Sequence, residues 1–388
     1  MPQSPPSKIL LITRNLPPLI GGMERLNWHM ADEISKYAEV QVIGPSGSAA
    51  RKPENVTLRE APLKPLPLFL IVTFLKGLWL ALRWRPDTIL AGSGLTAPTA
   101  WLLSKLCGVR SAAYLHGFDI TADHTVYRRL WRPTFKKLDR VIVNSTPTRD
   151  LALAAGVAPD RISIVFPGVT LPKTRKPESS ISAFKQQHGL EGKKILLSVG
   201  RLTTRKGLRE FVEFSLPDIV KAEPNAVLLV VGEAPKNSLG AGIQSVESIQ
   251  AQADASGVGD HIKFLGVITD PALLATAYEA ADVHVFPVRH IPNDPEGFGM
   301  VAIEAAAHGL PTVAFATGGV IDAVSQGQSG KLAQPENYTE LSEGIISHFS
   351  SVTDLDGIRS FAAQFGWEAF AKKLHIALGS SAISKQAA

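Results

Sequence analysis

Two glutamates stand eight residues apart in the run PEGFGMVAIEAAAHGLPTVAF, residues 295–315. Glu296 lies just before a helix predicted to begin near Gly299, and Glu304 lies just over one turn inside it. Gly297 and Gly299 allow a tight turn, so free N–H groups of the first helical turn can bind a diphosphate or a sugar hydroxyl. Glu304 then points one turn deeper, toward a group such as a ribose diol. Alternatively, Glu296 is a loop acid and Glu304 pairs with a surface lysine, but an unpaired carboxylate in so apolar a run is costly.

Basic residues cluster in a second segment, SVGRLTTRKG, which follows a predicted strand and opens the next helix. Arg201 and Lys206, at the carboxyl end of that strand, can neutralise the two phosphates of a nucleoside diphosphate as it leaves. We expect both to face the glutamate pair across a cleft. Arg205 and Arg209 are predicted to be solvated charges at the start of the helix.

Two turns in the first half of the chain carry weaker signals. The turn RNLPPLIGGMERL holds Gly21 and Gly22 before the first predicted helix, where a glycine pair permits close approach of the backbone to phosphates or to a sugar. The segment AYLHGFD places His116 after a strand, where the imidazole can hydrogen-bond a sugar hydroxyl or serve a structural role. Arg14 and Asp119, in the same two segments, are candidate contacts to an acceptor or a sugar.

Metal ligands are scarce near these segments. The only Asp-x-Asp pattern is Asp354-Leu-Asp356, in a late helical region, and no His/Cys spacing suits zinc. The single cysteine, Cys107, lies in an apolar pattern and is predicted to be a core residue. We therefore expect no cofactor and no metal, with Arg201, Lys206 and the helix terminus supplying the neutralising charge.

The net charge of +5 conceals opposite charges in the two halves of the chain. Residues 1–170 hold 21 Lys and Arg against 12 Asp and Glu, whereas the remainder holds 19 against 23. A basic first half predicts an anionic partner, such as a membrane surface or a phosphorylated acceptor. Nucleic acid is not expected, because no basic run is interleaved with aromatic residues. The apolar run Ile9–Ile12 is too short for a signal peptide, which predicts a cytoplasmic location.

Short apolar runs alternate with helix-length amphipathic stretches, the pattern of βα units around a parallel sheet. Strands are predicted at 8–13, 40–44, 88–91, 111–115, 140–144, 163–166, 194–199, 226–232, 262–265, 283–286 and 312–315. Helices are predicted near 23–36, 68–84, 97–107, 126–137 and 147–155, from about 207, 244, 270 and 299, and from 336 onward. The proline-rich stretch 167–177 divides two Rossmann-like, doubly wound α/β domains, 1–170 and 171–365. Ligands of such sheets bind beyond the carboxyl ends of the strands, so we expect a cleft site that draws on both domains.

The stretch LFLIVTFLKGLWLAL, residues 68–82, raises the question of a membrane. Its 15 residues fall short of the ~20 needed to span a bilayer. Two interpretations stay open. The helix packs on the first sheet, or it also lays an apolar face on a membrane, helped by Trp79, Arg83, Trp84 and Arg85 at its end.

These residues resemble those of retaining glycosyltransferases of the GT-B fold, family 4, which include bacterial mannosyl- and rhamnosyltransferases. The resemblance covers nearly the whole chain and rests on four segments: P-P-x-x-G-G at 17–22, His116-Gly117, G-R-L-x-x-x-K-G at 200–207, and E-x7-E at 296–304. It implies that Arg201 and Lys206 hold the diphosphate and Glu304 the ribose, while Glu296 and His116 contact the donor sugar. The implied catalytic residues are Glu296, His116, Arg201 and Lys206. The implied donor contacts are Gly21, Gly22, Arg201, Lys206, Glu296, Gly297, Phe298, Gly299, Met300, Val301 and Glu304.

The resemblance also implies transfer from a nucleoside-diphosphate sugar with retention at the anomeric carbon, without a metal, the leaving phosphate accepting the acceptor's proton. It favours mannose or rhamnose on guanosine diphosphate over uridine-based donors. The C-terminal region 366–388, with Trp367, resembles the family's helix that crosses back to the first domain. The loop 288–297 looks longer and more polar than the commonest family version, so sugar specificity does not carry over from any one member.

The basic first domain and its apolar helix favour an acceptor on the inner face of the cytoplasmic membrane. A polyprenyl-diphosphate-linked glycan in lipopolysaccharide or capsule assembly is the leading hypothesis, and a soluble acceptor is the alternative. A nucleotide-sugar 2-epimerase of the same fold is a second alternative. A dinucleotide-dependent oxidoreductase, from the pattern Gly92-Ser-Gly94-Leu-Thr-Ala97, and a solute-binding protein without chemistry are weaker ones.

Overall fold

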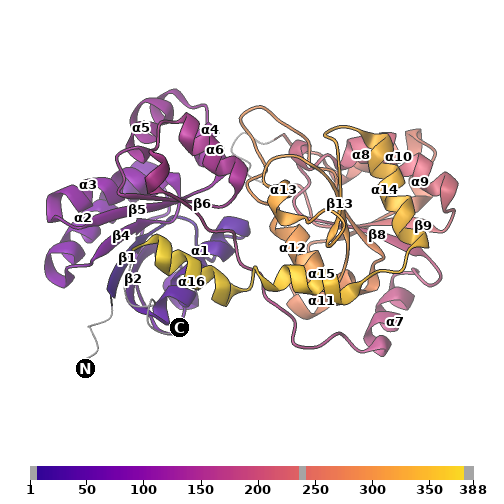
Figure 1. Ribbon diagram of the computed structural model, residues 1–388, viewed down its shortest axis with the longest axis horizontal. Coiled ribbons are helices and arrows are strands. Elements are labelled where there is room, and N and C mark those ends of the chain that lie inside the picture. The colour runs from indigo at the N-terminus through magenta and orange to yellow at the C-terminus, as the bar shows by residue number, and fades with distance from the viewer. Residues whose placement is uncertain (1–6, 236–241, 380–388) are drawn as a thin grey trace. The chain divides into compact units, whose positions relative to one another are not determined.

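The computed structural model describes residues 7–235 and 242–379. The chain forms two compact units, each built around one parallel sheet (Figure 1). Unit 1 comprises everything up to Gly168 together with the segment that begins at Trp367, and unit 2 is Val169–Gly366. The predicted pair of Rossmann-like α/β domains is confirmed.

Seven strands form the sheet of unit 1 in the order β3-β2-β1-β4-β5-β6-β7, and neighbouring strands are parallel. They are β1 (Ser7–Ile12), β2 (Ala38–Pro45), β3 (Val56–Ala61), β4 (Thr88–Ala91), β5 (Arg110–Leu115), β6 (Arg140–Val143) and β7 (Ile162–Ile164). The strand order reverses between β1 and β4. The segments after β1, β4 and β5 therefore meet at the carboxyl edge where doubly wound sheets bind ligands.

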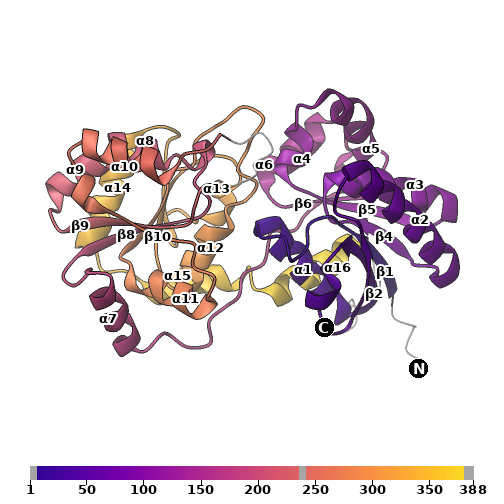
Figure 2. The ribbon, with the colours of Figure 1, turned by 180° about the vertical axis from the view of Figure 1, so that it is seen from behind.

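Helices cover both faces of this sheet. They are α1 (Gly22–Ser35), α2 (Leu66–Trp84), α3 (Ala97–Cys107), α4 (Gly117–Thr121), a π-helix (Tyr127–Trp131), α5 (Arg132–Phe135), α6 (Thr146–Ala154) and α16 (Trp367–Ala377). The helices α2, α3, α5 and α6 bury side chains in one apolar core against the strands, and α1 packs with α16 (Figure 2). His29 of α1 stacks on Trp367 with ring centroids 4.0 Å apart, which holds the C-terminal helix on unit 1. The part of the predicted region 366–388 that follows Gly379 lies outside the described residues.

Six strands form the sheet of unit 2 in the order β10-β9-β8-β11-β12-β13, again parallel. They are β8 (Lys194–Val199), β9 (Ala226–Val231), β10 (Ile262–Gly266), β11 (Val283–Phe286), β12 (Thr312–Phe315) and β13 (Gly330–Ala333). Successive side chains of a strand point to opposite faces. Leu196 accordingly joins one core while Ile195 and Leu197 join the other.

The helices of unit 2 divide between these two cores. They are α7 (Glu178–Gln187), α8 (Leu208–Phe214), α9 (Leu216–Ala222), α10 (Val246–Ala255), α11 (Pro271–Ala280), α12 (Met300–Ala307), α13 (Val320–Ala323), α14 (Tyr338–Ser350) and α15 (Leu355–Ala363). The core with Leu196 is shared by α8, α9, α10 and α14, and the other by α7, α11 and α12. The bounds of β8, β11 and β12 are those predicted from the apolar runs.

Several elements differ from expectation. β3 and β13 were not predicted, because neither has a continuous apolar run, and the helices α4, α7 and α13 were not predicted either. In β3 only Val56 and Ala61 are buried, and β13 has four residues. The helix predicted at 126–137 is a π-helix that continues as the short α5. π-Helical turns are rare and occur frequently at functional sites.

The apolar helix α2 is longer than the stretch that predicted it. It has 19 residues and is long and apolar enough to cross a membrane by length and composition alone. However, Phe69, Thr73 and Leu80 of this helix are buried against unit 1. The first interpretation, packing on the sheet, therefore holds for one face of α2, whereas the opposite face is exposed.

Candidate functional site

The turn GRLTTRKG, here called the phosphate turn, directly follows β8 in unit 2. Gly200 and Gly207 have φ values of 142° and 67°, which favour glycine. A Cβ on Gly207 would lie 2.3 Å from the carbonyl oxygen of Pro287, in the loop after β11. Glycine thus lets the turn lie directly against that loop. Within the turn Arg201 is exposed, whereas Lys206 is largely buried.

Lys206 and Glu296 form an ion pair, with Nζ and Oε2 2.8 Å apart. Burial lowers the pKa of Lys206, and the Glu296 carboxylate only partly offsets this. Burial opposes ionisation of Glu296 as well, but Lys206 and Arg205 together lower its pKa to about 2. The expectation that Lys206 faces Glu296 across a cleft is wrong, because both residues belong to unit 2 and touch.

Arg205 is the second cation beside Glu296. Its side chain is 13% exposed, its Nη1 pairs with Oδ1 of Asp294, and its Nε lies 3.3 Å from Oε2 of Glu296. Nη1 also donates to the carbonyl oxygen of Pro295 at 3.2 Å. The prediction that Arg205 is solvated is therefore wrong, because the loop 288–297 folds over it. Arg209, which is 49% exposed, matches the prediction.

Two glycines after β12 support the same loop from another side. The N–H of Gly319 donates to the carbonyl oxygen of Glu296 at 2.9 Å. A Cβ on Gly318 would lie 2.6 Å from that oxygen, and a Cβ on Gly319 would lie 2.2 Å from the carbonyl oxygen of Gly297. Backbone atoms cannot yield as a flexible side chain does, so both positions need glycine. Sequence reasoning missed them, although a glycine pair directly after a predicted strand was the available signal.

The helix α12 begins where the glycine-rich run predicted it. Gly299, with a φ of 95°, is its N-cap, and Met300 is its first residue. The side chain of Phe298 is 2% exposed and packs beside Phe365, so only its backbone remains to contact a donor. Met300 and Val301 are half-buried, and their N–H groups belong to the first turn, where a helix has no internal acceptors.

Glu304 is half-buried on α12, and its Oε2 accepts a hydrogen bond from the Tyr278 hydroxyl at 3.2 Å. The Tyr278 ring stacks on His308 with centroids 5.4 Å apart. Nδ1 of His308 lies 2.9 Å from the buried Glu279, which also accepts from the N–H of Lys176 at 2.7 Å. The carboxylate predicted to bind ribose is thus oriented by a buried tyrosine, which sequence reasoning did not find.

In unit 1, Asp119 supports the backbone that carries His116. Its Oδ2 accepts from the N–H of His116 at 2.9 Å, and its carboxylate also accepts a backbone hydrogen bond from Gly94. Burial raises the pKa of Asp119 and lowers the pKa of His116, which favours a neutral imidazole. Asp119 therefore joins the segments after β4 and β5.

Buried polar atoms without hydrogen-bond partners follow several strands of unit 1. Among the described residues they include Nε of Arg14 after β1, Oγ of Ser93 after β4, Nε2 of His116 after β5 and Oδ1 of Asn144 after β6. Leaving such an atom unpaired costs about 1–3 kcal/mol. A polar ligand at this carboxyl edge would satisfy them. Sequence reasoning found Arg14 and His116 but missed Ser93 and Asn144, which also stand at strand ends.

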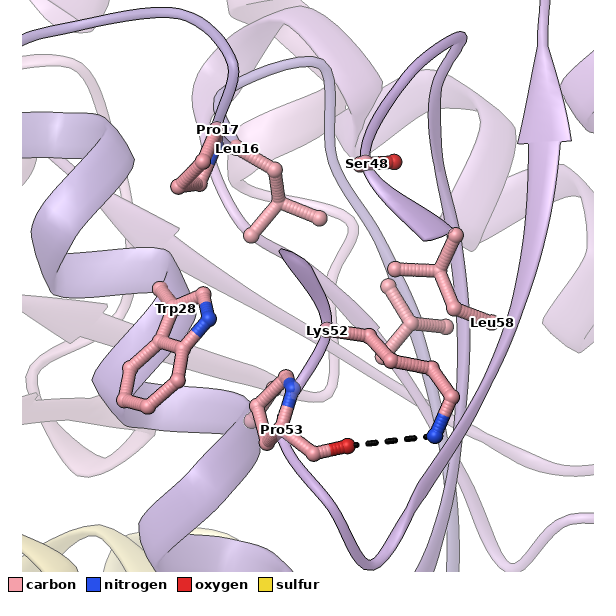
Figure 3. Close-up of a pocket in the computed structure, with 9 residues that line it drawn as sticks. Leu16, Pro17, Trp28, Ser48, Lys52, Pro53 and Leu58 are labelled. Atoms are coloured by element: carbon pink, nitrogen blue, oxygen red, sulfur yellow. Dashed lines mark hydrogen bonds between the residues drawn. The ribbon is translucent and has the colours of Figure 1, made fainter. Parts of the chain in front are cut away.

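The glycine pair of the first turn caps α1. Gly21 is the N-cap, and its carbonyl oxygen accepts from the N–H of Arg25 at 3.1 Å. α1 itself begins at Gly22. A small cavity adjoins the same turn (Figure 3), lined by Leu16, Pro17, Trp28, Ala31, Val42, Ser48, Lys52, Pro53 and Leu58. Its one charged group, Lys52, donates to the carbonyl oxygen of Pro53 at 3.3 Å, so the cavity offers no arrangement suited to a diphosphate.

Two known protein families match the chain. Glycosyltransferase Family 4 matches residues 20–172, and Glycosyl transferases group 1 matches residues 180–355. The first match falls almost entirely in unit 1, and the second lies in unit 2. The chain therefore consists of two glycosyltransferase domains and has the GT-B fold.

Several known proteins are similar to this glycosyltransferase at modest sequence identity. The D-inositol 3-phosphate glycosyltransferase of Segniliparus rotundus is 29% identical over 75% of this chain and 65% of its own length, just under two thirds. The GDP-mannose-dependent alpha-(1-6)-phosphatidylinositol monomannoside mannosyltransferase of Mycolicibacterium smegmatis is 27% identical over 87% of this chain and 88% of its own. The crystal structure of Anabaena HepE in complex with UDP has a TM-score of 0.79 at 21% identity, covering 96% of this chain and all of that one.

The surroundings of Gly92 and Gly94 argue against the dinucleotide-binding alternative. Gly92 and Gly94 follow β4, not the first strand. A Cβ on Gly92 would lie 2.0 Å from Oδ1 of Asn27, and one on Gly94 would lie 2.6 Å from the Tyr127 hydroxyl. These glycines lie against side chains of unit 1 rather than leaving backbone open to a pyrophosphate.

One group in the described parts of the chain has spacing suited to a metal. Ligand atoms of His29, Asp32 and Glu33, all on α1, lie within 4.8 Å of one another. Glu33 pairs with Lys36 at 2.7 Å, and burial lowers the pKa of His29 to about 4. The group includes none of the predicted donor or catalytic residues, so it does not test the expectation that transfer needs no metal.

Proposed function

We propose that this glycosyltransferase moves a hexose of the mannose or rhamnose type from a nucleoside-diphosphate sugar to a lipid-linked glycan, with retention and without a metal. The observation that carries the proposal is the Lys206–Glu296 ion pair at the mouth of α12. Its Nζ and Oε2 atoms lie 2.8 Å apart, so a cation suited to a phosphate is adjacent to a carboxylate suited to a sugar hydroxyl, which supports the proposal. The bond that breaks joins the diphosphate to the anomeric carbon. A cation that binds phosphate and a carboxylate that binds the sugar are therefore both needed beside that bond.

The charges around this pair suit a leaving diphosphate. Arg201 lies close enough to Lys206 and Glu296 to lower both pKa values. With Arg205 also present, three cations lie near two carboxylates, Glu296 and Asp294, and a diphosphate would balance the remaining positive charge. In the proposed step the acceptor oxygen bonds to the anomeric carbon as the bond from that carbon to the phosphate oxygen breaks. The leaving phosphate takes the acceptor's proton, so no further base is needed.

The preference for guanosine diphosphate is supported by the relative from Mycolicibacterium smegmatis, whose name states dependence on GDP-mannose. Glu304, held by Tyr278, would accept hydrogen bonds from the ribose diol of either nucleotide. The choice of base therefore lies with other residues. The base of the donor nucleotide is therefore to be measured directly.

The acceptor is proposed to bind unit 1, at the carboxyl edge with Arg14, Ser93, His116 and Asn144. The proposed acceptor is a polyprenyl-diphosphate-linked glycan of cell-surface polysaccharide synthesis, met at the inner face of the cytoplasmic membrane. The relatives from Segniliparus rotundus and Mycolicibacterium smegmatis are named for inositol 3-phosphate and for a phosphatidylinositol monomannoside. These two acceptors and the proposed lipid-linked glycan are all phosphorylated, which suits the basic first half of the chain.

The test is turnover by the purified full chain with GDP-mannose, GDP-rhamnose and UDP-glucose, in EDTA, with and without each acceptor type. We expect nucleotide release that depends on a lipid-linked acceptor, and NMR of the product should show the donor's anomeric configuration. A new nucleotide sugar formed without acceptor would instead identify an epimerase. Inversion, or loss of activity in EDTA, would refute the proposed mechanism.

A further inference from the structure

The helix α2 is apolar on two opposite faces. One face carries Phe69, Thr73 and Leu80, which are buried against the rest of unit 1. The opposite face carries five large exposed side chains at the three- and four-residue spacing of a single helical stripe. We call these the α2 stripe: Leu68, Ile71, Leu75, Trp79 and Leu82. Their exposed fractions run from 41% at Leu68 to 62% at Leu82.

The neighbouring helix α3 also exposes large apolar side chains. Figures 1 and 2 both show α2 and α3 side by side, and Gly77 of α2 lies against Leu103 of α3. On α3, Leu102 and Leu106 are 41% and 57% exposed. Scattered exposed apolar residues need no explanation, but gathered ones mark a binding surface.

The charged residues of α2 and of the turns directly beside it are all basic. Residues 61–86 contain Lys64, Lys76, Arg83 and Arg85 and no Asp or Glu, and all four basic side chains are exposed. Lys105 of α3 adds a fifth exposed cation. A long apolar stripe bordered by basic residues suits a helix that lies in the plane of an anionic bilayer. Lysine and arginine keep their charge among the headgroups while their stems and the apolar side chains enter below.

Other occupants fit these observations less well. α2 cannot cross a bilayer as unit 1 is folded, because its buried face packs on the sheet. A second copy of the chain would bring two surfaces of like charge together, which costs energy at short range. The anionic lipid surface alone complements both the apolar stripe and the basic border.

We propose that the outer face of α2, extended by Leu102 and Leu106 of α3, docks unit 1 on an anionic lipid bilayer. The apolar stripe enters the bilayer interface, and Lys64, Arg83 and Arg85 contact lipid phosphates. The biological role of this docking rests on the proposed transfer to a lipid-linked acceptor. The docking itself needs neither donor nor acceptor, so the two ideas can fail separately.

The test is co-sedimentation of the full chain with vesicles of phosphatidylglycerol and phosphatidylcholine, compared with phosphatidylcholine alone, without any nucleotide sugar. We expect binding to the anionic vesicles that weakens with salt. Leu75→Asp should reduce the partition coefficient by about tenfold or more, since interfacial binding scales with the buried apolar area. Its matched control is Ile376→Asp, a 67% exposed residue of α16, which should bind as the wild type does.

Two further variants test the contribution of the basic residues and the depth to which α2 enters the bilayer. Arg83→Glu, in the last turn of α2, should weaken binding about thirtyfold, since each basic residue near an anionic surface contributes about 1 kcal/mol and the change amounts to two charges. Lys221→Glu, in the last turn of α9, is the control. Vesicles should shift tryptophan emission to shorter wavelength in the wild type, and Trp79→Phe should remove most of that shift.

Three results would overturn the proposal. They are equal binding to neutral and anionic vesicles, equal losses in Leu75→Asp and Ile376→Asp, and a wild-type dimer that Leu75→Asp converts to monomer without change in vesicle binding. The last result would assign the α2 stripe to a second copy. Thermal unfolding of Leu75→Asp at the wild-type temperature would show that the fold is intact. Failure of the wild type to transfer sugar to a lipid-linked acceptor, with its vesicle binding unchanged, would count against the proposed function alone.

Discussion

Nζ of Lys206 lies 2.8 Å from Oε2 of Glu296, although 90 residues separate them in the chain. A diphosphate that binds Lys206 must share it with this carboxylate. We expect Lys206→Ala to lower kcat by about 10²–10³-fold, the usual cost of removing one group that stabilises charge in a transition state. Glu296→Gln should abolish detectable transfer. Circular dichroism and thermal unfolding should show that both variants fold, and Arg209→Ala is the control for loss of an exposed cation from the same helix region.

The same pair makes a prediction about pH. The pKa of Glu296 is lowered from 4.5 to about 2 in the folded chain, so its ionised form stabilises the fold above the unfolded value. That contribution is fully present above about pH 4.5 and is lost as the pH falls through about 2. Urea unfolding at pH 5, 4 and 3 should therefore show the stability of the wild type falling relative to Glu296→Gln. The relative slope cannot exceed about 1.4 kcal/mol per pH unit for one titrating group. A difference that stays constant over this range would show that Glu296 is not held ionised.

Arg205 of the phosphate turn and Asp294 of the loop 288–297 form a second pair, and both side chains are mostly buried. Arg205→Ala removes the cation that pairs with the buried Asp294, whereas Asp294→Ala leaves Arg205 paired with Glu296 alone. Breaking one side of a buried pair costs about 3–5 kcal/mol, whereas removing both costs less. We expect either single variant to destabilise the chain and raise the KM for the donor, with the double variant no worse than the poorer single. Strictly additive losses would show that the pair does not anchor the loop.

The two pairs also show what the sequence could and could not predict. Lys206 and Glu296 stand out by residue type, because a cation after a strand and an acid before a helix imply a ligand. Their direct contact does not follow from either segment alone, because it depends on the order of β8 and β11 in the sheet. Arg205 was misjudged for the same reason, since its partner lies 89 residues further along the chain in an irregular loop.

The best-predicted strands lie inside their sheets. Strands β8, β11 and β12 of unit 2 are mostly apolar and largely buried, and their bounds were predicted correctly. The edge strands β3 and β13 have fewer buried positions and no continuous apolar run. The expectation of a cleft site that draws on both domains stays a prediction.

Tyr278 gives a milder prediction, because it contributes one hydroxyl to Glu304 at 3.2 Å. Tyr278→Phe keeps the ring that stacks on His308 and removes only this hydrogen bond. A bond of this kind contributes about 1.5–3 kcal/mol when its partner is charged, so we expect nucleoside diphosphate to bind roughly tenfold more weakly. Calorimetric titration with GDP and UDP measures the effect. Tyr338→Phe, in the same unit, should leave both affinities unchanged, and an equal loss there would mean that Tyr278 does not act through Glu304.

The final prediction concerns Gly319, where steric contact alone decides the outcome. Its φ of −69° is acceptable to any residue, so alanine would introduce no backbone strain. The added Cβ would nevertheless lie 2.2 Å from the carbonyl oxygen of Gly297 and 2.5 Å from Cα of Phe298, forcing the loop with Glu296 to move. We expect Gly319→Ala to lower kcat by at least tenfold, since small misplacements of catalytic groups are costly.

Gly344→Ala is the matched control for this steric effect. A Cβ on Gly344 would lie 3.0 Å from Cγ1 of Val313 and 3.1 Å from Cδ of Lys331, both side-chain atoms that can shift. Within the helix α14 alanine is also favoured over glycine by about 1 kcal/mol, so this variant should be at least as active as the wild type. If Gly319→Ala kept full activity, the backbone of Gly297 and Phe298 would have to be mobile enough to accept the methyl group. The conformation of the loop 288–297 would then depend on the Arg205–Asp294 pair rather than on Gly319.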